Sequence, residues 1–402
     1  MKKIMILGGG MNQMGLIHAA KEVGLQVILC DYNPEAMGVP FADKFYQVSI
    51  IDRDAVLGVA RKEAVDGVVA NTEAVMQLVA YICETMGLPG NAEASIEMLV
   101  SKKEFRAMQK CIGQFAPDFA EVSSFTELQV ALSAFLLPAI IKPSESSGTR
   151  GTHLITADTT TDELKQAYEI CREFSRNDLV TVESYIAMPS LTVIEGDLFI
   201  NHGEILWDGL FFTRRSPAAP MIPMTYIFPL ELDAEHYARL QQALTEAFRA
   251  ADVQHGQYNV ELYFTASDDL FLIEINARQG GNKIPLAIKL HCGIDMDRLL
   301  VTTAVGDDSY WDELKTYVRP ERFTAWHLVF PRNAGVLREV QFSEEIRDRV
   351  IYQEMFYQPG DVLEDTENAA SWMGCVGLRF DSSTQMWNLM ERLEDLICPI
   401  IE

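Results

Sequence analysis

Residues 258–281 carry the side chains best suited to chemistry, because two carboxylates and two carboxamides occupy matched positions there. Apolar and polar residues alternate on both sides of the run Ala-Ser-Asp-Asp, which predicts two strands joined by a turn. A turn at the centre of that run places Glu261 opposite Glu274 and Asn259 opposite Asn276. Like charges facing each other across strands, about 5 Å apart at Cβ, are destabilising. Mg²⁺ would offset the repulsion, since it binds one or two carboxylates together with substrate phosphates; a solvated acidic hairpin is the alternative.

The residues after this hairpin favour an anionic ligand. Arg278 lies two positions beyond Asn276 and shares its face if the strand continues. Gly280 and Gly281 then allow the backbone to approach a ligand closely. A cation beside paired carboxylates and two glycines suits an anionic substrate.

Two lysines earlier in the chain suit phosphate. Lys142 ends an apolar strand predicted over residues 139–143, and the loop SESSGTRG that follows is rich in hydroxyl and N–H donors. The loop lacks the GxxxxGK[ST] pattern of a P-loop, and a flexible linker is the alternative. Lys102 falls in the first turn of a helix with a capping box at Ser101 and Glu104, where a cation is unfavourable unless an anion binds. A solvated surface charge is the alternative for Lys102.

A carboxylate interrupts the apolar strand predicted over residues 179–186. A buried Glu183 needs a partner, which is either the amino group of a purine or a nearby lysine.

The first 88 residues predict a small open α/β domain. The predicted strands are residues 3–7, 26–30, 44–48 and 67–70, and helices cover residues 14–23, 52–63 and a stretch through 81–86. The glycines at positions 8–10 invite a dinucleotide interpretation, but Gln13 stands where GxGxxG requires glycine, so NAD is the minority alternative. Glu73 follows a strand at the edge where such sheets bind ligands; a helix-capping acid is the other interpretation.

The middle and the end of the chain give weaker patterns. Residues 191–194 and 197–200 predict an antiparallel pair that residues 205–212 continue, and residues 284–290 and 296–304 predict helices. Residues 213–220, with Arg214, Arg215 and several prolines, predict a lid over an anionic substrate or a plain surface loop. Beyond residue 306 we expect strands at 324–330 and 376–380, a closing helix and a structural role for His327.

Composition excludes several classes of protein. The 402 residues, 48% hydrophobic and 23% charged, predict a globular chain of two or three domains. A net charge of −25 argues against binding nucleic acid or an anionic membrane surface. Seven scattered cysteines lack metal-ligand spacing, and the chain shows neither a signal-type start nor an apolar run of 18 residues. We therefore expect reduced thiols and a cytoplasmic location.

The chain resembles the ATP-grasp enzymes. The resemblance rests on motifs in a fixed order, namely Lys102, IIKP at Lys142, the SSGTRG loop, VESYI at Glu183, and EINAR after Glu261. The chain is most similar to the carboxylate–amine ligase branch of these enzymes, which includes biotin carboxylase, purine-pathway ligases and L-amino acid ligases. The resemblance implies an α/β fold with α+β elements. It divides the chain into a Rossmann-like domain at 1–88, an ATP-grasp domain at 89–305 and a C-terminal lobe at 306–402.

The resemblance also assigns roles to individual residues. It implies ATP contacts from the two lysines, the Ser/Gly loop and the strand end, namely Lys102, Lys142, Ser146, Ser147, Gly148, Thr149, Gly151, Glu183, Ser184, Tyr185 and Ile186. It implies Mg²⁺, or Mn²⁺ in its place, on Glu261, Glu274 and Asn276, with Arg278 as the catalytic cation. Substrate contacts are expected from Gly9, Gly10, Glu73, Arg214, Arg215, Arg278 and Gly280. Ser190 replaces the glutamate that often binds ribose, and the stretch after Glu183 lacks the histidine expected for biotin carboxylation.

The implied reaction joins a small carboxylate, for example an amino acid, to an amine through an acyl phosphate, with release of ADP and phosphate. The implied partners are these small molecules and a second copy of the chain. A non-catalytic ATP sensor and an NAD-dependent oxidoreductase are the alternatives.

Overall fold

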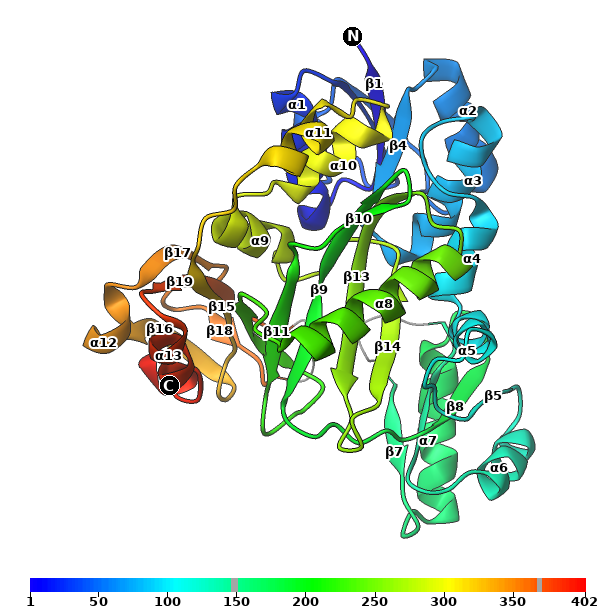
Figure 1. Ribbon diagram of the computed structural model, residues 1–402, viewed down its shortest axis with the longest axis vertical. Helices are drawn as coiled ribbons and strands as arrows, with labels where there is room; N and C mark the ends of the chain where they lie inside the picture. The colour runs from blue at the N-terminus through cyan, green and yellow to red at the C-terminus, as the bar shows by residue number, and fades with distance from the viewer. Residues whose placement is uncertain (146–150, 367–370) are drawn as a thin grey trace.

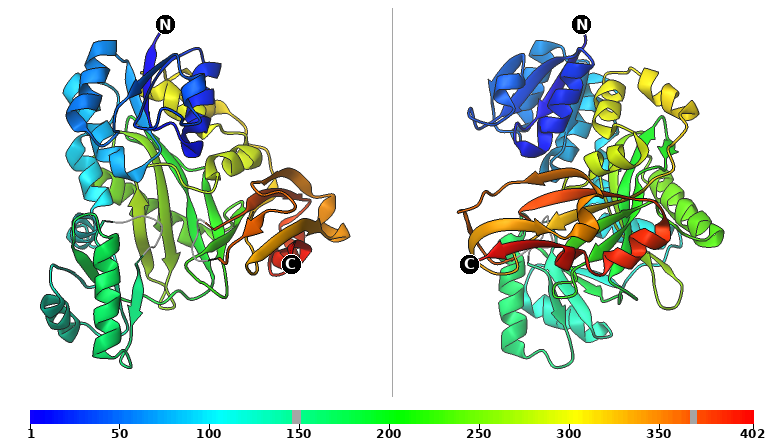
Figure 2. Two further views of the ribbon diagram at one scale, coloured as in Figure 1. Left: turned by 180° about the vertical axis from the view of Figure 1, so that it is seen from behind. Right: turned by 90° about the vertical axis from the view of Figure 1, so that its left-hand side faces the viewer.

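The structure is a computed structural model that describes residues 1–145, 151–366 and 371–402. A nine-stranded antiparallel sheet occupies its centre (Figure 1). A parallel sheet of N-terminal residues and a small antiparallel sheet lie at opposite ends of the central sheet, and the C-terminal residues flank it on one side (Figures 1 and 2).

The N-terminal sheet is parallel with the order β3-β2-β1-β4. Its strands are β1 (Lys3–Leu7), β2 (Gln26–Asp31), β3 (Lys44–Gln47) and β4 (Gly67–Ala70), and its helices are α1 (Met14–Glu22), α2 (Arg53–Glu63) and α3 (Met76–Met86). Strand β1 is buried on both faces, as expected for a strand covered by helices on each side. These elements confirm the strands and helices predicted for this part of the chain.

The small antiparallel sheet has the order β5-β8-β6-β7. It consists of β5 (Phe119–Val122), β6 (Ala139–Pro143), β7 (His153–Ile155) and β8 (Val180–Ser184), with α6 (Phe125–Ala134) and α7 (Thr161–Phe174). Helices α4 (Glu93–Val100) and α5 (Lys102–Cys111) lead into it. The Ser101 side chain accepts a hydrogen bond from the backbone N–H of Glu104, so α5 begins at the predicted residue.

The central sheet has the order β14-β13-β9-β11-β12-β15-β19-β17, with β10 paired to β9. Its strands are β9 (Thr192–Asn201), β10 (Glu204–Leu206), β11 (Leu210–Arg215), β12 (Pro223–Phe228), β13 (His255–Phe264), β14 (Leu270–Asn276), β15 (Phe323–Val329), β17 (Val350–Met355) and β19 (Gly374–Phe380). Helix α8 (Ala234–Ala250) packs on the face that carries Ile194, Val260 and Leu262. Helix α9 (Ile284–Cys292) packs on the opposite face, followed by α10 (Met296–Ala304) and α11 (Ser309–Thr316).

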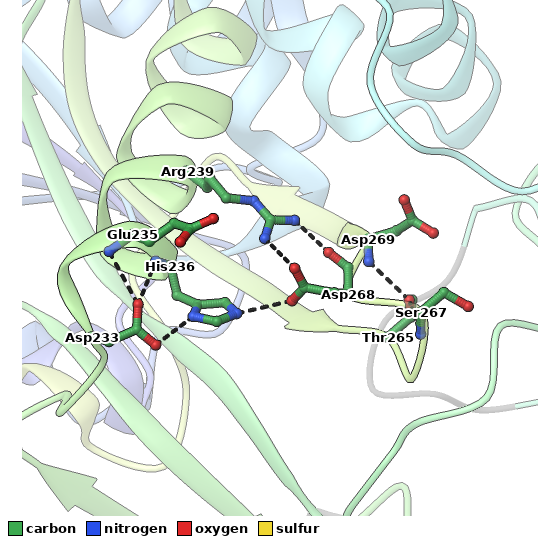
Figure 3. A network of polar contacts seen from close by, with 8 residues as sticks. All are labelled: Asp233, Glu235, His236, Arg239, Thr265, Ser267, Asp268 and Asp269. Atoms are coloured by element: carbon green, nitrogen blue, oxygen red, sulfur yellow. Dashed lines mark hydrogen bonds and ion pairs between the residues drawn. The ribbon is translucent and has the colours of Figure 1, made fainter.

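A polar cluster holds the turn of the β13–β14 hairpin against α8 (Figure 3). Asp268, at the turn, accepts a hydrogen bond from Arg239 at 2.6 Å and contacts Nε2 of His236 at 2.9 Å. Asp233 caps α8 by accepting from the N–H groups of Glu235 and His236. The cluster therefore fixes the hairpin turn to a helix end.

The C-terminal part adds a three-stranded sheet of order β18-β16-β20. It contains β16 (Gly335–Phe342), β18 (Val362–Leu363) and β20 (Ile397–Ile401), with α12 (Glu344–Arg347), α13 (Ser383–Met390) and α14 (Leu393–Leu396). The chain thus ends in a strand rather than in the predicted closing helix, because residues 397–401 pair with β16. His327 is buried with its Nδ1 2.9 Å from the hydroxyl of Thr225, which agrees with a structural role.

Two further expectations are wrong. Residues 191–194 and 197–200 do not form a hairpin, since β9 runs unbroken through Gly196, where a Cβ would lie 2.2 Å from the carbonyl oxygen of Gly209. The polar residues that suggested a turn are instead satisfied within the sheet. Residues 213–215 are not part of a lid, because they complete β11 and pair with β12. None of the described helices is long and apolar enough to cross a membrane.

Candidate active site

Three carboxylates stand in one row across neighbouring strands of the central sheet. Glu274 on β14 is opposite Glu261 on β13, and Glu261 is opposite Glu195 on β9. The register also places Asn259 opposite Asn276, which confirms both pairs predicted from the hairpin. All three carboxylates lie on the face opposite to α8. The row is therefore a concentrated negative charge at the open end of the α9 face.

Arg215 and Thr213 partly compensate this charge. Arg215 lies two residues beyond Thr213 on β11, next to a β-bulge, and shares its face; its Nη2 donates to Oε1 of Glu261. The hydroxyl of Thr213 donates to Glu195 at 2.7 Å. Burial raises the pKa of Glu195, and the Thr213 hydrogen bond acts against that rise.

Arg214 lies elsewhere. Its Nη1 donates to the carbonyl oxygen of Met390 at the end of α13, on the other side of the sheet from the carboxylates. The structure thus brings only one of the two predicted substrate arginines to the carboxylate row.

Glu261, Glu274 and Asn276 fit a hard divalent cation. The Asn276 amide donates to Oε1 of Glu274 at 2.8 Å, so the two side chains are already adjacent. Two facing carboxylates and a carboxamide are the oxygen donors that Mg²⁺ combines with phosphate oxygens. Within the described part of the chain, no group of three or more His, Cys, Asp or Glu side chains forms a metal site by itself. The donor set therefore needs oxygens from a bound substrate to complete it.

Glu183 is a buried carboxylate between two cations. It accepts from Arg106 Nε at 3.0 Å and from Lys142 Nζ at 2.6 Å. Burial acts to raise the pKa of Glu183. The positive charges of Lys142 and Arg106 nevertheless hold this pKa at about 2. Arg106 also donates to the Ile273 carbonyl at 2.9 Å, so this cluster links α5, the small sheet and β14.

Lys102 and Lys142 lie near each other on the side of the small sheet that faces β14. Lys102 Nζ donates to the carbonyl oxygen of Ser144 at 2.9 Å. Burial lowers the pKa of Lys102, and the charge of Lys142 lowers it further. Two close ammonium groups opposite a carboxylate row suit a polyphosphate with its counter-ion.

The strand end after Glu183 packs against a small apolar cluster. Val193, Tyr263 and Phe271 are buried there, and Ile186 and Met188 pack against them. The hydroxyl of Tyr263 donates to the Ile186 carbonyl at 2.7 Å, and the Tyr185 N–H donates to Pro138 at 3.0 Å. An apolar cluster of this kind at a strand end is a surface against which an aromatic base can pack.

The predicted Ser/Gly loop is described only in part. Ser146, Ser147, Gly148 and Thr149 lie outside the described residues. Gly151 has φ +72°, and a Cβ there would lie 3.0 Å from Pro143 Cγ.

Arg278 joins the central sheet to the N-terminal domain. Its Nη2 lies 3.3 Å from Oε2 of Glu73, and its Nη1 donates to the Gln279 carbonyl at 2.9 Å. A cavity of about 40 Å³ borders Arg278, Tyr258 and Cys83, which is the size of a water molecule rather than of a substrate. Glu73 and Arg278 thus form the domain junction beside the carboxylate row.

The glycines predicted to contact substrate have tight surroundings. The Gly9 N–H donates to Asp31 at 2.7 Å, and Gly10 precedes the turn that carries Gln13. The Gly280 N–H donates to buried Asp197 at 2.8 Å, and a Cβ on Gly280 would lie 2.5 Å from Ile284. These glycines hold backbone turns next to the domain junction.

Sequence reasoning missed Glu195 and Arg106. Glu195 sits in Glu-Gly-Asp, which resembles a turn, and only its register beside Glu261 brings it into the row. Arg106 sits in a charged helix, yet its side chain is only 4% exposed. Its position between Phe105 and Met108 on the buried side of α5 is the signal that was available.

Comparison with known proteins agrees with this geometry. A model of the ATP-grasp N-terminal domain matches residues 17–90, and a model of the ATP-grasp domain matches residues 135–285. Together the two models cover Glu73, Lys142, Glu183, the carboxylate row and Arg278.

Several curated proteins are similar over most of the chain. An uncharacterized protein of Sinorhizobium fredii is 25% identical over 74% of this chain, which spans 62% of that protein's length. A formate-dependent phosphoribosylglycinamide formyltransferase of Bacteroides thetaiotaomicron is 27% identical over 69% of this chain and 71% of its own. An L-arginine-specific L-amino acid ligase of Bacillus subtilis is 25% identical over 76% of this chain and 73% of its own.

Solved structures give the same fold. The crystal structure of an L-amino acid ligase from Bacillus licheniformis superimposes with a TM-score of 0.81 at 19% identity, covering 100% of this chain and 99% of that one. The matched domains, the similar ligases and the shared fold together show that the chain belongs to the ATP-grasp family.

Proposed function

We propose that this protein is an ATP-dependent ligase that joins a small carboxylate to an amine through an acyl phosphate. The observation that carries the proposal is the row of Glu274, Glu261 and Glu195 facing the Lys102 and Lys142 ammonium groups. Opposed carboxylates and lysines match the needs of a metal-bound triphosphate, because phosphoryl transfer depends mainly on positioning and charge neutralisation.

In the first step a carboxylate oxygen of the substrate attacks the γ-phosphorus of ATP. The new O–P bond forms as the bond to the β,γ-bridging oxygen breaks, and ADP leaves. Lys102 and Lys142 neutralise the phosphates. Mg²⁺ bound by Glu261, Glu274 and Asn276 would supply charge neutralisation between phosphate groups.

In the second step the neutral amine attacks the acyl carbon. The bond between that carbon and the phosphate oxygen breaks, phosphate leaves, and the nitrogen loses a proton to solvent. Arg278 is suited to hold the carboxylate first and the oxyanion of the tetrahedral intermediate later. Its ion pair with Glu73 keeps the guanidinium at the domain junction before substrate binds.

The nucleotide is expected to lie between the two sheets. The adenine would pack against the apolar cluster of Tyr263, Phe271 and Ile186, beside the backbone of residues 184–186. Lys142 is held near this strand end by its hydrogen bond to Glu183.

We propose an amino acid or a similar small acid as the carboxylate substrate, supported by the similarity to proteins named L-amino acid ligases. The domain limits at residues 88 and 305 remain proposals; β12 pairs with β15, so the central sheet continues across the second limit. A homodimer is also proposed. A cytoplasmic location is supported by the seven cysteines, all of which are free thiols.

The test measures ADP release from Mg·ATP with pools of carboxylic acids, using hydroxylamine as the acceptor. Acid-dependent ADP together with a hydroxamate would identify the acyl phosphate route and the acid. ATP binding without ADP or hydroxamate across broad acid pools would overturn the proposal and favour a nucleotide sensor.

A further inference from the structure

The face of the central sheet that carries the carboxylate row continues toward the C-terminal strands. Register places Thr213 opposite Tyr226, Tyr226 opposite Trp326, and Trp326 opposite Gly377. Gly377 is in turn opposite Tyr352 on β17. Because side chains two residues apart on a strand share a face, Glu354 lies on the same face of the sheet as Glu261 and Glu274.

The segment after Arg278 crosses this face in a strained conformation. Asn282 and Lys283 have φ values of +52° and +61°, in the left-handed region that residues with a side chain seldom adopt. The Asn282 amide donates to the Tyr226 hydroxyl at 2.9 Å, and Trp326 Nε1 donates to the Asn282 carbonyl at 3.0 Å. Two residues of the face therefore hold this conformation in place.

The strained segment directs Lys283 to Glu354. The ammonium group of Lys283 contacts Oε2 of Glu354, and the Tyr352 hydroxyl donates to the same carboxylate. Side-chain exposure is 26% for Lys283 and 36% for Glu354, so a ligand can reach both charges. Burial acts to raise the pKa of Glu354. The hydrogen bonds from Lys283 and Tyr352 nevertheless hold this pKa below its ordinary value.

Aromatic rings border the ion pair. The Phe356 ring centroid lies 5.6 Å from Lys283 Nζ, and Tyr352 stacks on Trp326 with centroids 5.2 Å apart. A partly exposed ion pair contributes little to stability, whereas left-handed residues other than glycine cost free energy. Stability alone is a poor reason for this arrangement, and strained positions of this kind concentrate at ligand sites.

We propose that Lys283, Glu354 and Tyr352 recognise the amine substrate, and that this substrate is an α-amino acid. The carboxylate of the substrate binds Lys283, which is released from Glu354. The α-amino group loses its ammonium proton to solvent, donates a hydrogen bond to Glu354 and keeps its lone pair free to attack the acyl carbon. Arg278 serves the other substrate, whose carboxylate is activated. The assignment rests on the proposed ligase activity and names the class of its acceptor.

The test compares two acceptors after the acid has been identified. Lys283→Met should keep hydroxamate formation within about twofold of wild type, because hydroxylamine carries no carboxylate for Lys283, and Glu354→Gln is measured beside it with both acceptors. With an amino acid acceptor, each variant should raise the acceptor KM about 10-fold or more, as expected when a hydrogen bond to a charged group is lost. Wild type should also discriminate against the decarboxylated amine, and Lys283→Met should lose that discrimination.

Two controls separate recognition from structure. Lys289→Met removes the ion pair that Lys289 of α9 forms with Asp295 at 2.5 Å. This control should leave the reaction rates with both acceptors unaffected. The exchanged variant Lys283→Glu with Glu354→Lys preserves the pair and should still bind the amino acid poorly. Equal losses with both acceptors, or recovery in the exchanged variant, would overturn the assignment. Absence of wild-type hydroxamate would instead overturn the ligase proposal and this assignment with it.

Discussion

Replacing Arg278 with alanine separates a catalytic contribution from a structural one. Nη2 of Arg278 lies 3.3 Å from Oε2 of Glu73, and each side chain is about one-fifth exposed. Loss of this ion pair should therefore cost about 1 kcal/mol of stability. For a chain of this size that corresponds to a thermal midpoint lower by a few degrees, roughly 2–4 °C. Loss of one group that stabilises an oxyanion costs about 3 kcal/mol in the barrier, or roughly 100-fold in kcat. The effect on turnover should therefore greatly exceed the effect on folding.

The assay is acid-dependent hydroxamate formation, measured beside the thermal midpoint of each variant. Arg319→Ala is the matched control, because Arg319 forms a partly buried pair with Asp208 at 2.6 and 2.9 Å away from the carboxylate row. It should lose similar stability and retain turnover. Near-normal kcat for Arg278→Ala, or equal losses of kcat in both variants, would refute the catalytic role of Arg278.

Three further predictions concern charge. Glu183→Gln leaves Arg106 and Lys142 without their carboxylate and should cost about 3–5 kcal/mol, measured by denaturant unfolding; an unchanged midpoint would contradict the buried pair. Burial raises the pKa of Asp297 from 3.8 to about 7, so stability should fall as pH rises through that window. Asp297→Asn should remove about 3 kcal/mol of the stability difference between pH 5 and pH 8, measured from thermal midpoints at those two pH values, because about two pH units of the shift lie in that range. Chelation of Mg²⁺ should stop ADP release, and Glu274→Gln should need at least about 10-fold more Mg²⁺ to restore it; an unaltered Mg²⁺ requirement would exclude Glu274 as a ligand.

Local patterns predicted the part of the site that a single hairpin builds. The predicted pairing of Glu261 with Glu274 involves residues close together in sequence, although residues 262–264 pair one residue out of the predicted register and a bulge between Glu261 and Leu262 restores it. The same holds for the N-terminal βαβ elements, whose apolar periods are short and unambiguous. These features needed no knowledge of distant segments.

The remaining site residues depend on contacts between distant segments. Glu195 joins the row only because β9 pairs with β13, more than sixty residues later in the chain. Arg106 is buried because α5 packs against β14, whose Ile273 carbonyl accepts its hydrogen bond. Residues 213–215 resembled a loop because prolines and small residues follow them, whereas their strand character depends on the pairing of β11 with β9 and β12. Nonlocal pairing thus limited the prediction more than the chemistry of the residues did.

The same pairing explains how the C-terminal part can contribute to a site centred on residues 258–281. Strands β12 and β15 are almost one hundred residues apart in sequence but adjacent in the sheet, and β19 carries the face onward to β17. Glu354 therefore reaches the segment after Arg278 without any inserted loop. Groups for the phosphates lie at one end of this face and Lys283 and Glu354 at the other. A substitution at Glu354 can then change the choice of acceptor while leaving the carboxylate row intact, because the two ends share the sheet but no side chain.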